Sequence, residues 1–240
     1  MKIKVKGVIV PSDEKFIYDW FDIEATSPKD IDDQLETANG EELEVDINSP
    51  GGDVYSGSEI YTALKAYPSN VTMKIVGVAA SAASVIAMAG DRVLISPTAQ
   101  IMIHNVSAMV VGDYRALQHE ADVIKNYNTS IANAYALKTG MDQKELLGMM
   151  NKETWLNAQQ AVEHGFADEI MFDESNRLVA SIGSYMLPPA VINKLRATIK
   201  DLQLSDPVPD PEPPTPTVPR QAPVDIFQKQ IQINRRKANV

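Results

Sequence analysis

The sequence contains no cysteine, and this absence excludes several kinds of chemistry. Without thiols the chain forms no disulfide, thiolate nucleophile, iron–sulfur cluster or cysteine-ligated zinc site. Histidine is scarce as well, with three residues among 240. If the chain performs nucleophilic catalysis, serine is the favoured nucleophile, and only three side chains need testing as its imidazole base.

Positive charge and long apolar stretches are also limited. Lys and Arg number 22 against 32 Asp and Glu, so the formal net charge is −10. This balance argues against nucleic acid or an anionic membrane as a partner, because both attract basic surfaces. No apolar stretch approaches the roughly 20 residues of a membrane span, and the first residues turn polar too early for a signal peptide. We therefore expect a cytoplasmic protein.

Proline is abundant in one place only. Of the 15 prolines, eight fall within residues 206–223. Proline breaks helices and central strands, so this stretch predicts an extended, acidic linker. We expect a catalytic domain over residues 1–185, a helix over 186–204, the linker over 205–223 and a tail over 224–240. The tail is interpreted either as disordered or as a docking segment for another protein.

Strand and helix patterns alternate within residues 1–185. The expected strands cover residues 2–10, 43–47, 71–77, 92–95, 100–104 and 169–172. The expected helices cover residues 27–39, 56–66, 82–89, 113–138, 142–150 and 158–164. Such alternation predicts an α/β fold with a largely parallel sheet and helices outside it.

Two segments of small residues follow expected strands. In residues 49–52 (SPGG), adjacent glycines allow backbone N–H groups to face a ligand without side chains intervening, as an oxyanion or a phosphate requires. Ser81 lies at a strand-to-helix junction, where its hydroxyl and nearby backbone N–H groups could act together. The alternatives are a simple tight turn at 49–52 and a helix-capping role for Ser81.

Each histidine has its own sequence setting. His119 lies along a long polar helix, and His164 lies at a helix end, where it could act as a cap. His104 ends an apolar strand, and α/β folds place their ligands at the carboxyl ends of strands. His104 is therefore the best base for Ser81, although the residues alone select no acid to orient the imidazole.

Four motifs occur in order along the chain: residues 48–52 (NSPGG), 77–81 (GVAAS), 102–104 (MIH) and 158–168 (AQQAVEHGFAD). Together they resemble the Clp protease proteolytic subunit family of serine peptidases over residues 3–175. The resemblance implies a crotonase-like spiral of βαβ units with a protruding handle helix. It also implies a homo-oligomer, a heptamer ring that stacks face to face with a second ring, and hydrolysis of polypeptide substrates without a metal or cofactor.

The resemblance assigns roles residue by residue. Ser81 matches the family nucleophile and His104 its general base, while the handle helix corresponds to residues 113–138. The third member of the triad is usually Asp, but the aligned residue here is Glu153. Asp168 and an unpaired Ser–His dyad remain alternatives for this role.

The same resemblance predicts how a peptide is held. The backbone N–H groups of Gly52 and Ala82 would form the oxyanion hole. Gly51, Asp53 and Val54 would line the substrate-binding cleft, where an extended peptide could pair with a strand edge.

Within the family, the chain looks most like the Clp-related head maturation proteases of phages and prophages. Residues 153–158 (ETWLNA), the short segment before the first strand and the proline-rich extension carry this likeness. It implies a capsid or scaffold protein as substrate and leaves an unfoldase partner uncertain. The alternatives are ATP-dependent degradation with a Clp unfoldase, a crotonase-like acyl-CoA hydratase or isomerase, an inactive assembly protein and a serine–lysine peptidase.

Overall fold

The computed structural model describes residues 1–173. The predicted helix over 186–204, the linker over 205–223 and the tail over 224–240 lie outside the described residues, as does the end of the predicted domain over 1–185. The described strands are β1 (Lys2–Ile9), β2 (Ala25–Thr26), β3 (Leu43–Gly52), β4 (Val71–Ala80), β5 (Arg92–Ile95), β6 (Gln100–Ile103), β7 (Thr154–Asn157) and β8 (Glu169–Ile170). The described helices are α1 (Lys15–Trp20), α2 (Pro28–Ala38), α3 (Val54–Lys65), α4 (Ala82–Ala87), α5 (Tyr114–Thr139), α6 (Gln143–Met150) and α7 (Ala158–Glu163).

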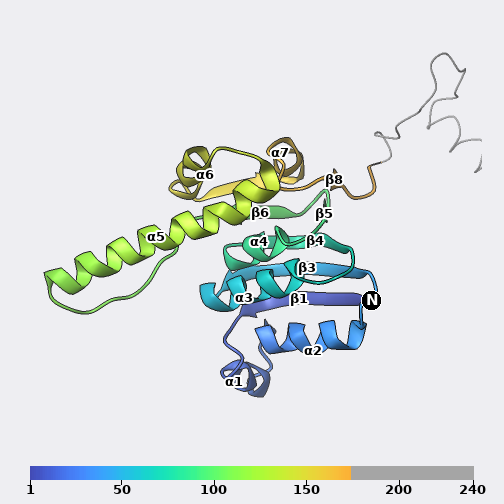
Figure 1. The fold of residues 1–240 in the computed structure, drawn as a ribbon, viewed down its shortest axis with the longest axis horizontal. Helices are drawn as coiled ribbons and strands as arrows, with labels where there is room; N and C mark the ends of the chain where they lie inside the picture. The colour runs from blue at the N-terminus through green and yellow to red at the C-terminus, as the bar shows by residue number, and fades with distance from the viewer. Residues whose placement is uncertain (174–240) are drawn as a thin grey trace, which may run out of the picture. The chain divides into compact units, whose positions relative to one another are not determined.

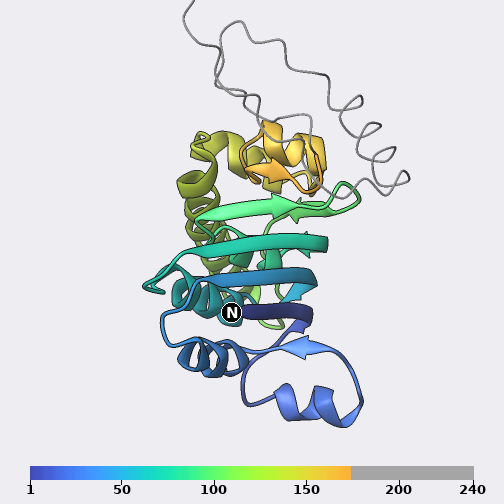
Figure 2. The same cartoon turned by 90° about the vertical axis from the view of Figure 1, so that its right-hand side faces the viewer.

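These strands form one sheet that is parallel except at one pair. The order is β2-β1-β3-β4-β5-β8, while β6 pairs with β4 and the antiparallel β7 pairs with β6. Figure 2 shows the strands side by side as a twisted stack. Strand β4 pairs with two different strands along its length: residues 72–75 pair with β5, and residues 78–80 pair with β6. The prediction of a largely parallel α/β sheet is confirmed.

The local sequence explains several element boundaries. Ser27 caps α2, and its side chain and that of Asp30 form a reciprocal capping box. Pro28 occupies the first helical position, where a backbone N–H would have no partner within the helix, so its missing N–H costs nothing. Asn39 ends the helix in the left-handed conformation. The predicted helix over 27–39 therefore matches α2 closely, because both of its ends are specified by nearby residues.

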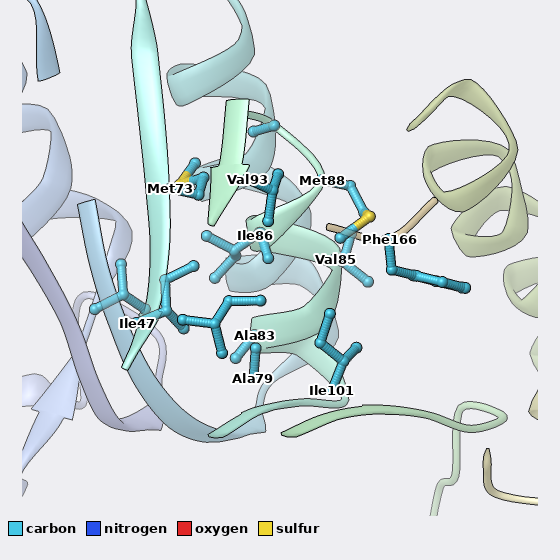
Figure 3. Packing of buried hydrophobic residues seen from close by; sticks show 14 of the residues in the cluster. Ile47, Met73, Ala79, Ala83, Val85, Ile86, Met88, Val93, Ile101 and Phe166 are labelled. Atoms are coloured by element: carbon cyan, nitrogen blue, oxygen red, sulfur yellow. The ribbon is translucent and has the colours of Figure 1, made fainter. Parts of the chain in front are cut away.

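The core lies between the central strands and α4. All six residues of α4 are buried, and the four small ones, three alanines and Ser84, allow the helix backbone to approach the sheet. Figure 3 shows Ala83 and Ile86 of α4 in the same apolar cluster as Ile47, Met73 and Val93. This packing fixes the start of α4, which directly follows Ser81.

Helix α5 is only partly packed. Its buried residues are confined to positions 128–135, and Figure 1 shows the helix projecting away from the sheet. The preceding segment exposes large apolar side chains, with Met109 98% and Val111 97% exposed. The predicted handle helix over 113–138 is thus present as α5.

Three elements were missed by the sequence patterns. Helix α1 has only six residues and buries none of them, and β2 has only two residues. Strand β7 buries only Leu156 of its four residues. Strands β3 and β4 also extend to Gly52 and Ala80, beyond their predicted ends, so both reach the region of Ser81.

Candidate active site

Ser81 occupies an unusual backbone position between β4 and α4. Its φ of 54° and ψ of −125° lie in a region that non-glycine residues rarely adopt. The Ser81 N–H donates to the Met102 carbonyl oxygen at 3.0 Å, which ties the turn to β6. The Ser81 side chain makes no capping hydrogen bond, so the helix-capping alternative is wrong. Its hydroxyl is instead directed to another partner.

That partner is His104. Pairing of Ala80 with Met102 brings the ends of β4 and β6 together, and His104 Nε2 lies 2.8 Å from Ser81 Oγ. Of the other two histidines, His119 is exposed on α5, while His164 occupies the C-cap position of α7. The structure therefore brings together the serine and the histidine that the sequence singled out.

The two-glycine turn lies against the Ser81 turn. Gly51 and Gly52 have φ values of 93° and 153°, and a Cβ placed on Gly51 would lie 2.7 Å from Ser81 Cβ. Ala82 is the first residue of α4, so its N–H has no partner within that helix. Gly52, Ala82, Ser81 and His104 line one cavity of about 280 Å³.

The remaining walls of this cavity come from α3 and α5. Val54 and Tyr55 line it from α3, and Glu120 and Tyr127 line it from α5. Tyr55 and Tyr127 meet edge to face, with ring centroids 5.3 Å apart. The cavity can thus hold a ligand between the Ser81 turn and α5.

The predicted substrate-binding residues differ in their positions. Val54 and Asp53 both line the cavity. The Asp53 carboxylate also accepts hydrogen bonds from the backbone N–H and the hydroxyl of Ser56, each at 2.7 Å, so it caps α3. Gly51 is buried behind the Ser81 turn, where it supports the cavity wall.

Glu153 directly precedes β7, and His104 directly follows β6. The antiparallel β6–β7 ladder ends at the pair of Ile103 and Thr154, so His104 and Glu153 are the next residues along the two chains. The Glu153 side chain is exposed and accepts a hydrogen bond from Trp155 Nε1 at 3.3 Å. Within residues 1–173, the His104 ring makes one hydrogen bond, to Ser81.

Asp168, the other acid considered, has different partners. Its carboxylate accepts hydrogen bonds from the Val93 N–H at 2.6 Å and from Lys138 Nζ at 2.7 Å. These bonds connect the start of β8 with β5 and the C-terminal part of α5. This arrangement favours a structural role for Asp168.

Two buried hydroxyl groups near Ser81 were missed by the sequence patterns. Ser84 Oγ lies 2.6 Å from the Ser81 carbonyl oxygen and 2.8 Å from Tyr135 Oη. Ser84 belongs to the run of small residues that marked the Ser81 segment. Tyr135 lies 51 residues further along the chain, and nothing in the sequence connects it to Ser84.

The described residues offer no ready metal site. No group of three His, Asp or Glu side chains within residues 1–173 is placed to hold a metal ion. No helix in this range combines the length and apolar character that crossing a membrane requires.

The chain matches the family model described as Clp protease over residues 23–174. Among similar proteins, the ATP-dependent Clp protease proteolytic subunit of Deinococcus radiodurans is 31% identical over 140 residues, which cover 57% of this chain and 69% of that protein. Proteolytic subunit 1 of Chlamydia muridarum is also 31% identical over 140 residues, covering 57% of this chain and 73% of that one.

A solved structure shows the same fold. It is a mutant of ClpP1 from Listeria monocytogenes, with a TM-score of 0.60 and 22% sequence identity. The match covers 72% of this chain and 92% of the ClpP1 chain. The predicted crotonase-like α/β fold is confirmed.

Proposed function

This chain belongs to the Clp protease family and is a serine-type endopeptidase, and we propose that Ser81, His104 and Glu153 form its catalytic triad. The observation that carries the proposal is the 2.8 Å hydrogen bond between Ser81 Oγ and His104 Nε2. Both residues line a cavity that can accept part of a substrate. A serine hydroxyl needs such a base to become a nucleophile near neutral pH.

In the proposed reaction, His104 removes the Ser81 proton as the hydroxyl oxygen attacks the peptide carbonyl carbon. The carbonyl oxygen becomes an oxyanion, and the N–H groups of Gly52 and Ala82 donate hydrogen bonds to it. His104 then donates the proton to the leaving amine, and an acyl-enzyme forms on Ser81. Water attacks this ester with His104 again as base, which releases the second product.

Glu153 would orient His104 by accepting the Nδ1–H hydrogen bond. The β6–β7 ladder supports this assignment, because its last pair, Ile103 and Thr154, directly adjoins His104 and Glu153 in the sequence. The carboxylate must leave Trp155 and turn toward the imidazole. We propose that Asp53 and Val54 form the adjoining part of the substrate cleft, and that Gly51 supports this cleft from behind the Ser81 turn.

The nucleophile can be tested with a fluorophosphonate label and mass spectrometry of the labelled peptide. Wild type should be labelled on Ser81, and Ser81→Ala should lose the label. Labelling of His104→Ala should be slower than that of wild type by a factor on the order of 10⁴, because removing either member of a serine–histidine pair disables the other. Equal labelling of wild type and Ser81→Ala would falsify the mechanism.

We further propose that the enzyme processes a capsid or scaffold protein during phage head maturation. The motif over residues 153–158 and the proline-rich segment over 205–223 support this proposal. Relatives carry the name ATP-dependent Clp protease proteolytic subunit, so degradation with a Clp ATPase is the alternative. The cytoplasmic location remains a prediction under both.

The two substrate classes separate by their need for ATP. The purified enzyme should cleave an assembled scaffold or capsid protein at defined sites without ATP. The Ser81→Ala variant provides the matched inactive control. Cleavage of folded proteins only when a Clp ATPase and ATP are present would favour the alternative.

We also propose a ring-shaped homo-oligomer, a heptamer or two stacked heptamers. The apolar side chains exposed before and along α5 support this proposal, with Tyr114 79% and Leu117 48% exposed. Assembly would cover such surfaces, and exposed apolar patches commonly mark interaction sites. Native mass spectrometry should find seven or fourteen subunits.

A further inference from the structure

Two buried hydroxyl groups form a hydrogen-bonded chain that ends on the Ser81 carbonyl. Ser84 of α4 is 0% exposed and Tyr135 of α5 is 1% exposed. A carbonyl oxygen only accepts, so the single Ser84 hydroxyl proton is directed to the Ser81 oxygen, 2.6 Å away. Ser84 Oγ must then accept the hydrogen bond from Tyr135, 2.8 Å away. The direction runs from Tyr135 through Ser84 to Ser81.

Tyr135 is well placed to fix this chain. Its ring packs against Phe166, with centroids 5.6 Å apart, so the phenol has little freedom to move. Burial raises the pKa of the Tyr135 phenol well above its ordinary value. Tyr135 therefore remains a protonated donor at neutral pH.

The Ser81 carbonyl and the Ala82 N–H belong to one peptide unit. This unit is planar, and its C=O and N–H bonds point in opposite directions. Fixing the carbonyl therefore also fixes the direction of the N–H. The backbone N–H groups of Ser84 and Val85 donate to the same oxygen at 2.9 and 3.4 Å. The Ser84 hydroxyl therefore adds a side-chain hydrogen bond to an oxygen that the helix backbone already binds.

We propose that Ser84 and Tyr135 are positioning residues that hold the Ala82 N–H toward the oxyanion. They act through the Ser81–Ala82 peptide. Ser84 is fully buried, and Tyr135 forms part of the cavity wall with 1% of its surface exposed. The inference rests on the proposed function, because it needs Ala82 as an oxyanion donor. The uncommon φ and ψ of Ser81 make such a restraint useful, since strained conformations persist only where the surroundings hold them.

The test uses Ser84→Ala, Tyr135→Phe and the double variant. Each substitution removes a hydroxyl and keeps most of the packing. Ser27→Ala and Tyr67→Phe are matched controls, because Ser27 is 1% exposed and bonded to Asp30, and the Tyr67 hydroxyl donates to Glu41 O at 3.0 Å. Neither control residue contacts the Ser81 turn. Active enzyme is counted by fluorophosphonate labelling carried to completion.

The expected change is in kcat. Ser84→Ala should lower kcat for a peptide substrate about tenfold with KM unchanged, since loss of a whole oxyanion donor costs about 10²–10³. Tyr135→Phe should give a smaller decrease, and the double variant should match Ser84→Ala because both act along one chain. Inhibition by a peptide boronic acid, which becomes tetrahedral on Ser81, should weaken in parallel with kcat. The controls should keep the wild-type kcat per labelled site.

Several outcomes would overturn the inference. They are a wild-type kcat per labelled site in Ser84→Ala, an effect on KM alone, and additive effects in the double variant. If Ser84→Ala fails to fold, Tyr135→Phe decides alone, and a wild-type kcat and boronate affinity in that variant refute the inference. Failure of wild type to label on Ser81 would refute the proposed function as well, which distinguishes the two failures.

Discussion

A methyl group added at Gly51 would collide with the turn that carries Ser81. An alanine Cβ at this position would lie 2.6 Å from the Ala80 carbonyl oxygen and 2.9 Å from the Ala82 nitrogen. It would also lie 2.7 Å from Ser81 Cβ. All three contacts are closer than folded proteins tolerate, and two involve backbone atoms that no side-chain rotation can move. Gly51→Ala should therefore displace the nucleophile and its oxyanion donor together.

The expected size of the effect follows from a comparison with Gly40. Both glycines have positive φ, 93° at Gly51 and 83° at Gly40, but a Cβ at Gly40 meets nothing within 4 Å. Gly40→Ala should cost only the conformational penalty of about 1–2 kcal/mol. Gly51→Ala adds overpacking of about 1–3 kcal/mol. Relief of the clash requires Ser81 to move, since ordinary Cβ contacts begin at 3.4 Å, and a misplacement of about 1 Å can lower the rate by about 10²-fold.

The assay compares both variants in urea unfolding and in peptide hydrolysis. Gly40→Ala should lose stability and keep wild-type kcat/KM. Gly51→Ala should lose more stability and about 10²-fold in kcat/KM, while the fraction that remains folded keeps its helical circular dichroism. If Gly51→Ala hydrolyses peptides as fast as Gly40→Ala, the Gly51 turn does not support the nucleophile and the reasoning is wrong.

Three further predictions concern acidic side chains. Glu153→Gln should slow peptide cleavage, but less than His104→Ala. Asp168→Asn should leave the cleavage rate unchanged and lower the urea midpoint, because the Asp168 carboxylate accepts hydrogen bonds from the β5 backbone and an α5 lysine. A slower cleavage by Asp168→Asn together with an unchanged rate for Glu153→Gln would transfer the acid role to Asp168. Hydrogen bonds, first from the Ala116 backbone and then from Arg115, hold the pKa of Asp113 below its ordinary value of 3.8. The stabilisation of α5 by the Asp113 cap should therefore be fully present above pH 3.8 and should weaken as the pH falls through the lower pKa of the folded state. Hydrogen exchange of the backbone amides at the start of α5 measures this change, and Asp113→Ala is the control that lacks the cap.

The sequence predicted elements well where nearby residues specify them. Ser27 with Asp30 defines the start of α2, and Asp113 accepts hydrogen bonds from two N–H groups at the start of α5. Elements that depend on distant pairing were missed or shortened. Strand β3 continues through Pro50 to Gly52 because β1 pairs with it as far as Gly52, although the local composition favours a turn.

The candidate site likewise combines residues that local sequence patterns predict with contacts that depend on tertiary packing. A serine at a strand-to-helix junction and a histidine at a strand end are local signals, and the parallel β4–β6 pairing brings them together. The contact between Ser84 and Tyr135 has no local signal. It depends on the depth at which α4 packs and on the path of α5, and both are set by tertiary packing.

Glu153, the acid that we propose for the triad, shows how strand pairing and side-chain contact can differ. The β6–β7 ladder, which the sequence patterns missed, ends at the Ile103–Thr154 pair, so His104 and Glu153 are the next residues along the two chains. Glu153 also has a positive φ of 50°, so the chain turns at this residue and directs its side chain away from the ideal ladder direction. A carboxylate on a longer side chain has more rotamers to choose from, and here it meets the Trp155 indole instead of the imidazole. Strand pairing therefore brings the two chain segments together, whereas the turn at Glu153 and its hydrogen bond with Trp155 decide where its carboxylate lies.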